Sequence, residues 1–279
     1  MASWTYIDGK WLPGNPPILG PMSHAMWLAS LVFDGARAFE GTTPDLDRHC
    51  ARVVQSARNL GLGPMLSCGE VEEIAREGVT LFPSGSALYI RPMFWAEDGF
   101  IQGDPESTRF ALAVYDKPMP ADPNFTATLS PFRRPSLECA PTDAKAACLY
   151  PNSGRALAEA GRRGFGNAVM LDLMGHVAEF ATANIFLAKD GVAHTPVPNG
   201  SFLNGITRQR VIKLLRGKGV EVIERTIAPA ELYEADEVFS TGNFGKVQFV
   251  TKLDQRRFEP GKIGQRARDL YWEFAFTGH

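Results

Sequence analysis

Several features that would define a class of protein are missing from the 279-residue sequence. No apolar run is long enough to span a bilayer, so we do not expect a membrane protein. The first residues show no basic segment followed by an apolar run, and a secretory signal is not expected either. The formal net charge is only −2, without a Lys/Arg-rich block or an acidic tail. This balance argues against nucleic acid or an anionic membrane as a partner.

The cysteines and histidines are too scattered to indicate a metal site. Cys50, Cys68, Cys139 and Cys148 form neither a CxxC pair nor a zinc-ligand spacing. Such cysteines are typical of reduced thiols, so we predict a cytoplasmic location and no metal. The motifs GxxxxGK[ST], GxSxG, HExxH and GxGxxG after a strand are also absent. Hydrolase, kinase and dinucleotide-enzyme functions therefore have little support.

What is present is the composition of a globular protein, with 44% hydrophobic and 22% charged residues. The length allows one large domain or two modest ones. Prolines cluster in "DKPMPADPNF", residues 116–125, and prevent a regular helix there. We interpret this stretch as an interdomain linker or a loop over a cleft. The predicted domains are 1–118 and 127–279, joined by a linker at 119–126.

Hydrophobic periodicity predicts an α+β first half. Asp8-Gly9 is typical of a turn between two short strands. An i, i+3, i+4, i+7 apolar stripe predicts a helix within 44–63, and Gly61 can end it. Strands are predicted at 87–95 and 108–116. Pro92 argues against a central place in the sheet for the first of these strands.

The second half also reads as α+β, with mostly short-range strand connections. A helix is predicted over 152–164, with Asn152 or Ser153 as N-cap and Gly164 beyond its end. The other predicted elements are short strands at 167–172, 176–180 and 184–191, a loop and helix at 205–219, a strand–loop–strand unit at 234–250 and a helix at 263–276.

Lys145 is the only charged residue between Ala144 and Gly154. An exposed loop lysine is the commonest explanation for such a residue. A second possibility is chemical, because desolvation disfavours the ammonium form and leaves an amine that can attack a carbonyl. The usual partner of such an amine is pyridoxal 5'-phosphate (PLP). This cofactor needs an acid at its ring nitrogen, donors at its phosphate and a hydrogen-bond partner at its ring hydroxyl.

The sequence offers candidates for the acid and the hydroxyl partner. Glu179 is the single acid in "HVAEFATAN" and lies at the end of a predicted strand. Tyr150, five positions after Lys145, could bond the ring hydroxyl. Taken alone, the first is more often a strand-end surface residue and the second a core or rim residue.

Phosphate donors are available in two glycine-containing loops. Gly205 permits close backbone approach, and the amides of Ile206 and Thr207 precede a helix. Thr207 could equally be a plain N-cap. The loop in "STGNFGKV", residues 240–247, offers further amides. Arg52 is the basic candidate, although it lies off the apolar stripe of its helix and by pattern alone would face solvent.

The order of these pieces resembles the class IV, or fold-type IV, PLP-dependent aminotransferases. The matching stretches are "AKAACLY", "EAGRRGFGNAVMLDLMGHVAEFATANIFLAKDG", "LNGITRQRVIKLL" and "ADEVFSTGN". In the first half, "MSHAMWLASLVFDGARAFEG", "RHCARV" and "ALYIRPMF" look like the small domain of branched-chain amino acid aminotransferases. The resemblance implies a small N-terminal α/β domain and a larger, β-rich C-terminal PLP domain with helices.

The resemblance also implies roles for individual residues. Lys145 would bind the cofactor covalently and shuttle a proton, Glu179 would face the pyridine nitrogen, and Tyr150 would bond the ring oxygen. The remaining cofactor contacts would come from Arg52, Leu203, Gly205, Ile206, Thr207, Gly242 and Asn243. The substrate pocket would be lined by Leu28, Phe33, Arg37, Tyr89, Arg91, Asn243 and Phe244. Tyr89 and Arg91 are two positions apart on a predicted strand and so share a face.

Some positions depart from the family pattern. Leu28 stands where branched-chain enzymes carry a pocket tyrosine, and Leu149 replaces the Asn before the catalytic tyrosine. Phe180 and Ala183 replace a Gly and an acid, and "GN" replaces "GT" at Asn243. Several of these changes touch the pocket for the substrate side chain and carboxylate.

The implied reaction is ping-pong transfer of an amino group from a branched-chain or other hydrophobic amino acid to 2-oxoglutarate. The resemblance implies a homodimer with shared active sites. The alternatives are a D-amino acid transaminase, an (R)-selective amine transaminase and aminodeoxychorismate lyase. An alternative of another class is a non-catalytic oligomeric binding protein.

Overall fold

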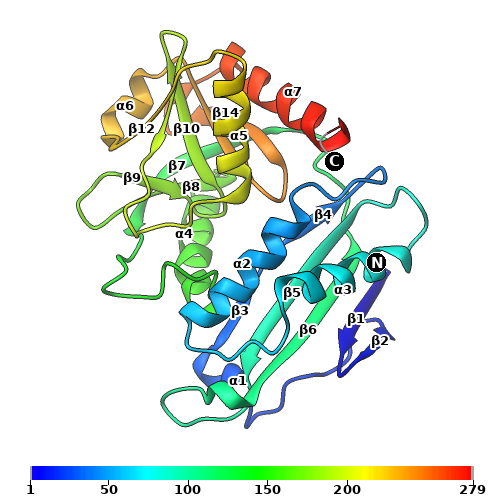
Figure 1. Ribbon diagram of the computed structural model, residues 1–279. Coiled ribbons are helices and arrows are strands. Elements are labelled where there is room, and N and C mark those ends of the chain that lie inside the picture. Colours follow the sequence, from blue (N-terminus) through cyan, green and yellow to red (C-terminus); the bar gives the residue numbers. More distant parts are fainter. Residues whose placement is uncertain (1, 278–279) are drawn as a thin grey trace. The chain divides into compact units, whose positions relative to one another are not determined.

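The computed structural model describes residues 2–277 and divides the chain into two compact units (Figure 1). Unit 1 contains the chain up to Met119 together with Asp143–Leu149, and unit 2 contains Pro120–Thr142 together with the chain from Tyr150 on. The domain boundaries drawn from the sequence remain predictions. The structure adds that the segment bearing Lys145 packs with unit 1.

Unit 1 is built on an antiparallel sheet with the strand order β2-β1-β6-β5-β3, in which β4 also pairs with β5. Asp8 and Gly9 both have positive φ and turn the chain between the first two strands, as the sequence predicted. The strands are β1 (Ser3–Ile7), β2 (Lys10–Pro13), β3 (Leu31–Phe33), β4 (Ala36–Ala38), β5 (Leu88–Ala96) and β6 (Thr108–Asp116).

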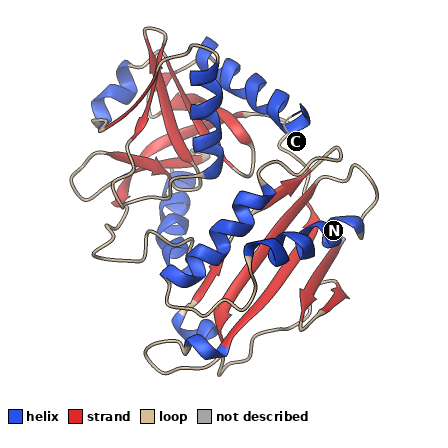
Figure 2. Cartoon of the chain, in the orientation of Figure 1, coloured by secondary structure: helices blue, strands red, loops and turns tan. Residues whose placement is uncertain are grey.

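Two helices of unit 1, α2 (Leu46–Asn59) and α3 (Cys68–Thr80), pack on this sheet (Figure 2). The predicted stripe of α2 is buried, and Gly61 follows the helix with a φ of 78°. Helix α3 was not predicted, although Ser67 and Glu70 form a capping box at its start. The unit is completed by α1 (His24–Leu28) and by the 3-10 turns η1 (Pro105–Ser107) and η2 (Ala147–Leu149).

The expectation that Pro92 keeps its strand out of the sheet centre is wrong. β5 lies between β6 on one side and β3 and β4 on the other. β3 pairs with residues 93–95 of β5 and β4 with residues 88–90, so the ladder on that side is interrupted opposite Pro92. The Pro92 carbonyl accepts the Asp34 amide at this break. The missing N–H of proline therefore falls where no ladder partner requires it.

Unit 2 contains a mixed sheet with the order β12-β11-β10-β13-β14-β7-β8-β9, and β15 pairs with β14. The β11–β12, β14–β7 and β7–β8 pairs are parallel, and the other pairs are antiparallel. Its strands are β7 (Asn124–Arg133), β8 (Asn167–Leu171), β9 (Val177–Phe180), β10 (Asn184–Lys189), β11 (Val192–Pro196), β12 (Val222–Arg225), β13 (Glu237–Gly242), β14 (Lys246–Leu253) and β15 (Arg256–Arg257).

The core of unit 2 is formed by apolar side chains of this sheet, among them Val169, Phe180 and Val250. Its helices are α4 (Tyr150–Arg162), α5 (Ile206–Gly217), α6 (Pro229–Glu234) and α7 (Lys262–Thr277). With helices and sheets in both units, the α+β fold class is confirmed.

Helix α4 starts earlier than the sequence predicted, at Tyr150, so Asn152 and Ser153 are not its N-cap. Both side chains serve tertiary contacts instead. Asn152 Nδ2 donates to the Arg133 carbonyl, and Ser153 Oγ accepts from Arg134. The far end of α4 agrees with the prediction, because Gly164 follows it with a φ of 80°.

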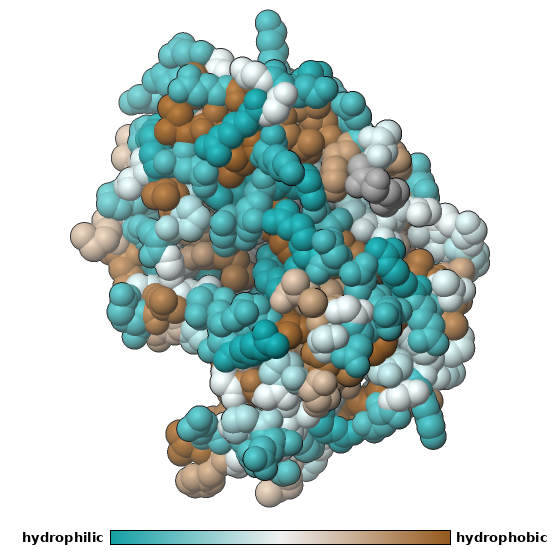
Figure 3. All heavy atoms as spheres, in the orientation of Figure 1, coloured by the Kyte–Doolittle hydropathy of each residue, from teal (hydrophilic) through white to brown (hydrophobic). Residues whose placement is uncertain are grey.

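None of the helices within residues 2–277 has the length and apolar character needed to cross a bilayer. On the face shown in Figure 3, hydrophilic side chains surround smaller hydrophobic areas.

Two glycines of the α4 region make a matched test of backbone conformation. Gly154 lies within the helix at ordinary φ with open space around its Cβ position, whereas Gly164 has positive φ. We expect Gly154→Ala to raise the free energy of unfolding by about 0.5–1 kcal/mol. Gly164→Ala should lower it by about 1 kcal/mol. Urea denaturation of both variants measures the difference, and equal effects of the two substitutions would contradict the assignment.

Candidate active site

The predicted site residues fall into two groups, one in each unit. Unit 1 holds Leu28 at the end of α1, Phe33 on β3, Arg37 on β4, Arg52 on α2, Tyr89 and Arg91 on β5, and Lys145. Unit 2 holds Tyr150 at the start of α4, Glu179 on β9, Leu203 in a loop, Gly205, Ile206 and Thr207 at the start of α5, and Gly242, Asn243 and Phe244 at the β13–β14 turn.

Lys145 is held by its backbone within unit 1. Its N–H donates to Ser56 Oγ at 3.1 Å, and its carbonyl accepts the Phe33 amide at 3.1 Å. The neighbouring Ala144 and Ala146 are fully buried, and Ala146 forms a β-bridge with Val32. Lys145 Nζ lies 5.0 Å from the centroid of the Phe33 ring. Two small buried neighbours thus fix the main chain, and the long side chain is placed against an aromatic ring.

Arg52 is anchored by a buried carboxylate that the sequence analysis did not single out. Asp34 is fully buried and accepts from Arg52 Nε at 2.6 Å and Nη2 at 2.8 Å. His49 Nδ1 lies 2.7 Å from the same carboxylate. Burial acts to raise the pKa of Asp34, but the charges and hydrogen bonds of Arg52 and His49 outweigh it and hold this pKa well below its usual range. The helical pattern alone placed Arg52 towards solvent, but the structure shows its side chain paired with the buried Asp34.

Arg37, Tyr89 and Arg91 are brought together on one part of the unit 1 sheet. Arg37 on β4 is paired with Tyr89 on β5. The guanidinium groups of Arg37 and Arg91 lie 5.9 Å and 5.4 Å from the centroid of the Tyr89 ring. Tyr115 was not predicted. Its ring stacks on Tyr89 at 5.5 Å, and its hydroxyl accepts a hydrogen bond from Arg91. Burial lowers the pKa of Arg37. Two guanidinium groups against tyrosine rings form a surface suited to a carboxylate.

In unit 2, the side chain of Asn184 connects Glu179 to the loop that begins α5. Asn184 Nδ2 donates to the Leu203 carbonyl at 2.9 Å and to Glu179 Oε2 at 3.3 Å. Its Oδ1 accepts the Gly205 amide at 3.1 Å. One buried carboxamide thus fixes the predicted ring-nitrogen acid and the predicted phosphate loop in a single hydrogen-bonded junction.

Glu179 also contacts a buried arginine. Arg134 Nε lies 3.2 Å from Glu179 Oε1 and donates to the Ser201 carbonyl at 3.1 Å. Arg134 is buried, and the Glu179 carboxylate is therefore held from two sides, by Arg134 and by Asn184.

The start of α5 is built for close backbone approach. Its N-cap is Gly205, not Thr207, which lies in the first turn, so the N-cap prediction for Thr207 is wrong. A Cβ at Gly205 would come within 2.1 Å of Asn184 Oδ1, which explains why only glycine fits. No side chain caps the helix. Amides of the first turn, from Ile206 and Thr207, therefore remain suitable donors to an anion.

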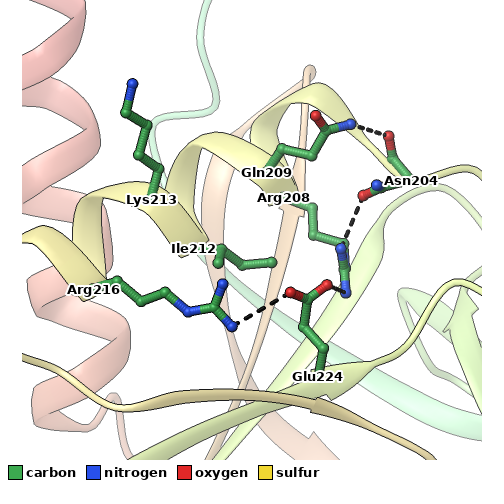
Figure 4. Close-up of a pocket in the computed structure, with 7 residues that line it drawn as sticks. All are labelled: Asn204, Arg208, Gln209, Ile212, Lys213, Arg216 and Glu224. Atoms are coloured by element: carbon green, nitrogen blue, oxygen red, sulfur yellow. Dashed lines mark hydrogen bonds and ion pairs between the residues drawn. The ribbon is translucent and has the colours of Figure 1, made fainter.

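A buried arginine, Arg208, also holds this turn and lines a pocket formed by residues of α5 together with Asn204 and Glu224 (Figure 4). Arg208 Nη1 donates to Asn204 Oδ1 at 2.8 Å, and Nη2 donates to Glu224 Oε2 at 2.9 Å. Nη2 also donates to the Pro196 carbonyl at 2.7 Å. Arg208 thereby ties the start of α5 to β11 and β12. Burial lowers the pKa of this arginine, and Glu224 opposes that shift.

The β13–β14 turn lies next to this junction. Thr241 on β13 is paired with Asn184 on β10, and a Cβ at Gly242 would come within 3.0 Å of the Ala183 Cβ. Glu179, the α5 start and the Gly242 turn are thus assembled around Asn184 within unit 2. The Asn243 Nδ2 atom is buried without a hydrogen-bond partner among the described residues. An amide-rich glycine loop with an unpaired buried donor fits the phosphate of a cofactor.

The other predicted residues lie at the surface of their units. Tyr150, Leu28 and Phe244 are more than a third exposed, at 37%, 40% and 48%. Among residues 2–277, no group of three or more His, Cys, Asp or Glu side chains is placed to hold a metal ion.

Sequence reasoning missed the residues that support the site: Asp34, His49, Tyr115, Arg134 and Asn184. Asp34 and Asn184 lie in the stretches "FDGAR" and "ATANIF", which were used to recognise the resemblance, but neither was given a role. Arg134 and Tyr115 carried no local signal, because their partners are distant in the chain.

The family model for the class IV aminotransferases matches residues 31–253. The chain belongs to the class IV aminotransferase family. The resemblance found in the sequence is therefore confirmed, and the protein is an aminotransferase by family.

Relatives match over nearly the full length of the chain. A probable branched-chain-amino-acid aminotransferase of Aquifex aeolicus is 33% identical, over 98% of this chain and 91% of its own. The crystal structure of a Brucella abortus aminotransferase bound to PLP has a TM-score of 0.98 and 54% identity, covering 99% of this chain and 100% of that one. An Escherichia coli branched-chain amino acid aminotransferase has a TM-score of 0.92 and 28% identity, covering 99% and 95%.

The buried Asp34 predicts how stability depends on pH. The pKa of Asp34 is lower in the folded state than in the unfolded chain. The ionised carboxylate therefore adds to the free energy of unfolding above about pH 4, and this stabilisation disappears as pH falls towards the pKa of the folded state. We expect Asp34→Asn to lower the free energy of unfolding at pH 7 by about 3 kcal/mol, because Arg52 loses its charged partner. The difference in the free energy of unfolding between the wild type and Asp34→Asn should become smaller as pH falls below about 4. Urea denaturation from pH 7 to pH 3 measures it, and a pH-independent difference would refute the argument.

Proposed function

We propose that this class IV aminotransferase uses PLP to move an amino group from a branched-chain or other hydrophobic amino acid to 2-oxoglutarate by a ping-pong mechanism. The observation that carries the proposal is the Asn184 junction, which fixes a carboxylate and an anion-binding helix start in one unit. The names of the relatives from Aquifex aeolicus and Escherichia coli support the branched-chain donor.

PLP, when bound, supplies a ring that accepts the electron pair left at the substrate α-carbon. Glu179 would hold a proton on the ring nitrogen, with its carboxylate oriented by Asn184 and Arg134. The amides at the start of α5, together with Arg52, would bind the phosphate. Leu203 would pack on the ring and Tyr150 would bond its oxygen.

Lys145 would bind the cofactor through Nζ and, once released, would take the α-proton of the substrate and deliver it to the carbon of the cofactor that held the amine. Its main chain is fixed at both N–H and carbonyl, so the proton transfer needs only side-chain motion. A positioned base of this kind contributes typically about 10²- to 10⁴-fold to a rate.

Substrate recognition would combine a basic and an apolar part. Arg37, Tyr89 and Arg91 would bind a carboxylate, and Tyr115 would orient Arg91. The carboxylates of 2-oxoglutarate suit a pair of guanidinium groups. The aromatic Phe33, beside Lys145, would contact an apolar side chain.

Leu28, Asn243 and Phe244 would also line the substrate pocket, and Gly242 and Asn243 would add contacts to the cofactor. Leu28 offers only apolar contact, which suits a hydrophobic donor. A cytoplasmic location and the domain boundaries 1–118 and 127–279 complete the proposal.

One test separates the proposed reaction from its alternatives. We expect the purified holoenzyme to show the visible absorbance of bound PLP and to convert leucine, isoleucine or valine only when 2-oxoglutarate is present. Lys145→Ala should abolish that absorbance and lower the rate by at least roughly a hundredfold. The control Lys189→Ala, at an exposed surface ion pair, should retain both.

Contrary outcomes of this test identify the alternatives. Pyruvate release from aminodeoxychorismate without an acceptor would indicate a lyase. Transfer only from D-alanine or (R)-1-phenylethylamine would indicate the other transaminases. A colourless protein that gains no absorbance with added PLP would indicate a binding protein.

A homodimer is part of the proposal and is supported by an exposed apolar group in unit 1. The group contains Met22 just before α1, Met26 and Trp27 within α1, and Phe100 and Ile101 in the loop after β5. All five are at least half exposed, and the Trp27 and Phe100 rings are 6.3 Å apart. Monomeric proteins rarely expose such groups, so we assign this surface to a second copy of the chain.

The dimer assignment is testable by light scattering. We expect the wild-type chain to have twice the monomer mass, and the double substitution Trp27→Glu and Phe100→Glu to shift it towards the monomer. Substituting the exposed Leu173 and Met174 of unit 2 by Glu should leave the mass unchanged. A wild-type monomer, or a variant that stays dimeric, would rule out this surface as the interface.

A further inference from the structure

The first residue of β14, directly after the β13–β14 turn, is a lysine in an unusual environment. Lys246 is buried, with 1% exposure, and its backbone is in the left-handed region at a φ of 62°. It pairs with Gly242 across the end of the hairpin, so residues 243–245 form the turn between them. A buried lysine side chain and a left-handed backbone at a residue other than Gly or Asn each cost free energy. Such a combination calls for an explanation of what the residue does in this position.

The Lys246 side chain reaches the turn itself. Its Nζ donates to Asn243 Oδ1 at 2.8 Å. A carboxamide can rotate by half a turn about its last bond and exchange its oxygen for its NH₂ group. An ammonium group only donates, so it stabilises the rotamer in which the oxygen faces Lys246. The NH₂ group of Asn243 must then face away from the lysine.

That NH₂ group has no partner of its own. Asn243 Nδ2 is buried without a hydrogen-bond acceptor among the described residues, and the same holds for the hydroxyl of Thr241, which is 1% exposed. Burying a donor without a hydrogen-bond partner costs free energy, and a bound ligand can supply the missing acceptor. Thr241 lies on β13 opposite Asn184, and Asn243 lies in the turn that follows this strand.

We propose that Lys246 is a positioning residue that fixes the Asn243 carboxamide with its Nδ2 directed to an anionic oxygen of the bound ligand. The anionic oxygen belongs to the cofactor phosphate or to the substrate carboxylate, which share this chemistry. The inference rests on the proposed function and adds the residue that decides whether the NH₂ group or the oxygen of Asn243 faces the ligand. Without the ammonium group, the carboxamide could present its oxygen to the anion and repel it.

The first experiment changes the donor itself. Full-length apoprotein is titrated with PLP and with pyridoxal, which lacks the phosphate, by visible absorbance, and KM is measured for leucine. Asn243→Asp keeps the oxygen that faces Lys246 but replaces the donor with a carboxylate oxygen. If the anionic oxygen belongs to the cofactor phosphate, the affinity for PLP falls by more than about tenfold and the affinity for pyridoxal is unchanged. If it belongs to the substrate carboxylate, KM rises by a similar factor and PLP affinity is unchanged.

The second experiment separates positioning from a general effect of charge or folding. Lys246→Met removes the ammonium group at similar length, and we expect a loss of roughly fivefold in the same constant. In the Asn243→Thr background the donor is a freely rotating hydroxyl, so adding Lys246→Met should change the constant by less than about twofold. Lys252→Met, a half-buried lysine farther along β14, is the matched control and should have no effect.

The outcomes are decisive. Equal losses from Lys246→Met in both backgrounds would show a structural or long-range charge effect and overturn the inference, as would unchanged constants in Asn243→Asp. Equal weakening of PLP and pyridoxal by Asn243→Asp, with KM unchanged, would also overturn it. A wild-type protein that binds PLP and transaminates, with variants like wild type, refutes this inference alone. A wild-type protein that does neither refutes the proposed function.

Discussion

The hydrogen bonds of one buried carboxamide hold together the part of unit 2 that we propose binds the cofactor. Asn184 is a short side chain at the start of β10, yet it contacts Glu179, the Leu203 carbonyl and the Gly205 amide. These groups lie on a strand, a loop and a helix start. Because one side chain makes all three bonds, the three elements have little freedom to move apart. The acid and the anion-binding amides are therefore prepared before any ligand arrives.

Three charged groups near the proposed site are fixed in a similar way. Asp34 fixes Arg52, Arg134 contacts Glu179, and Arg208 anchors the first turn of α5 through Asn204 and Glu224. In each case a charged side chain would be costly to bury alone and is stabilised by partners from other elements. The supporting residues thus define where the ligand-binding groups can point.

Local signals predicted much of the secondary structure. The apolar stripe of α2, the Asp8-Gly9 turn and the short strands of unit 2 follow from periodicity and from turn residues. The failures have a common cause. Pro92 is tolerated in an inner strand because β3 and β4 leave a gap opposite it. Helix α4 begins at Tyr150, and Asn152 and Ser153 bond to Arg133 and Arg134 instead of capping it. Neither fact is visible within a short window of sequence.

The sequence by itself determined the reaction family, because the stretches that carry Lys145, Glu179 and the Gly205–Thr207 loop resemble those of the class IV aminotransferases. It could also name the chemical type of each ligand-binding residue, since that depends on the side chain alone. Only the tertiary structure decided how those residues are held. Asp34 beside Arg52, Tyr115 beneath Arg91 and Lys246 against Asn243 are contacts whose role depends on distance and burial. Distance and burial are properties of the folded chain, so no local pattern of residues can specify them.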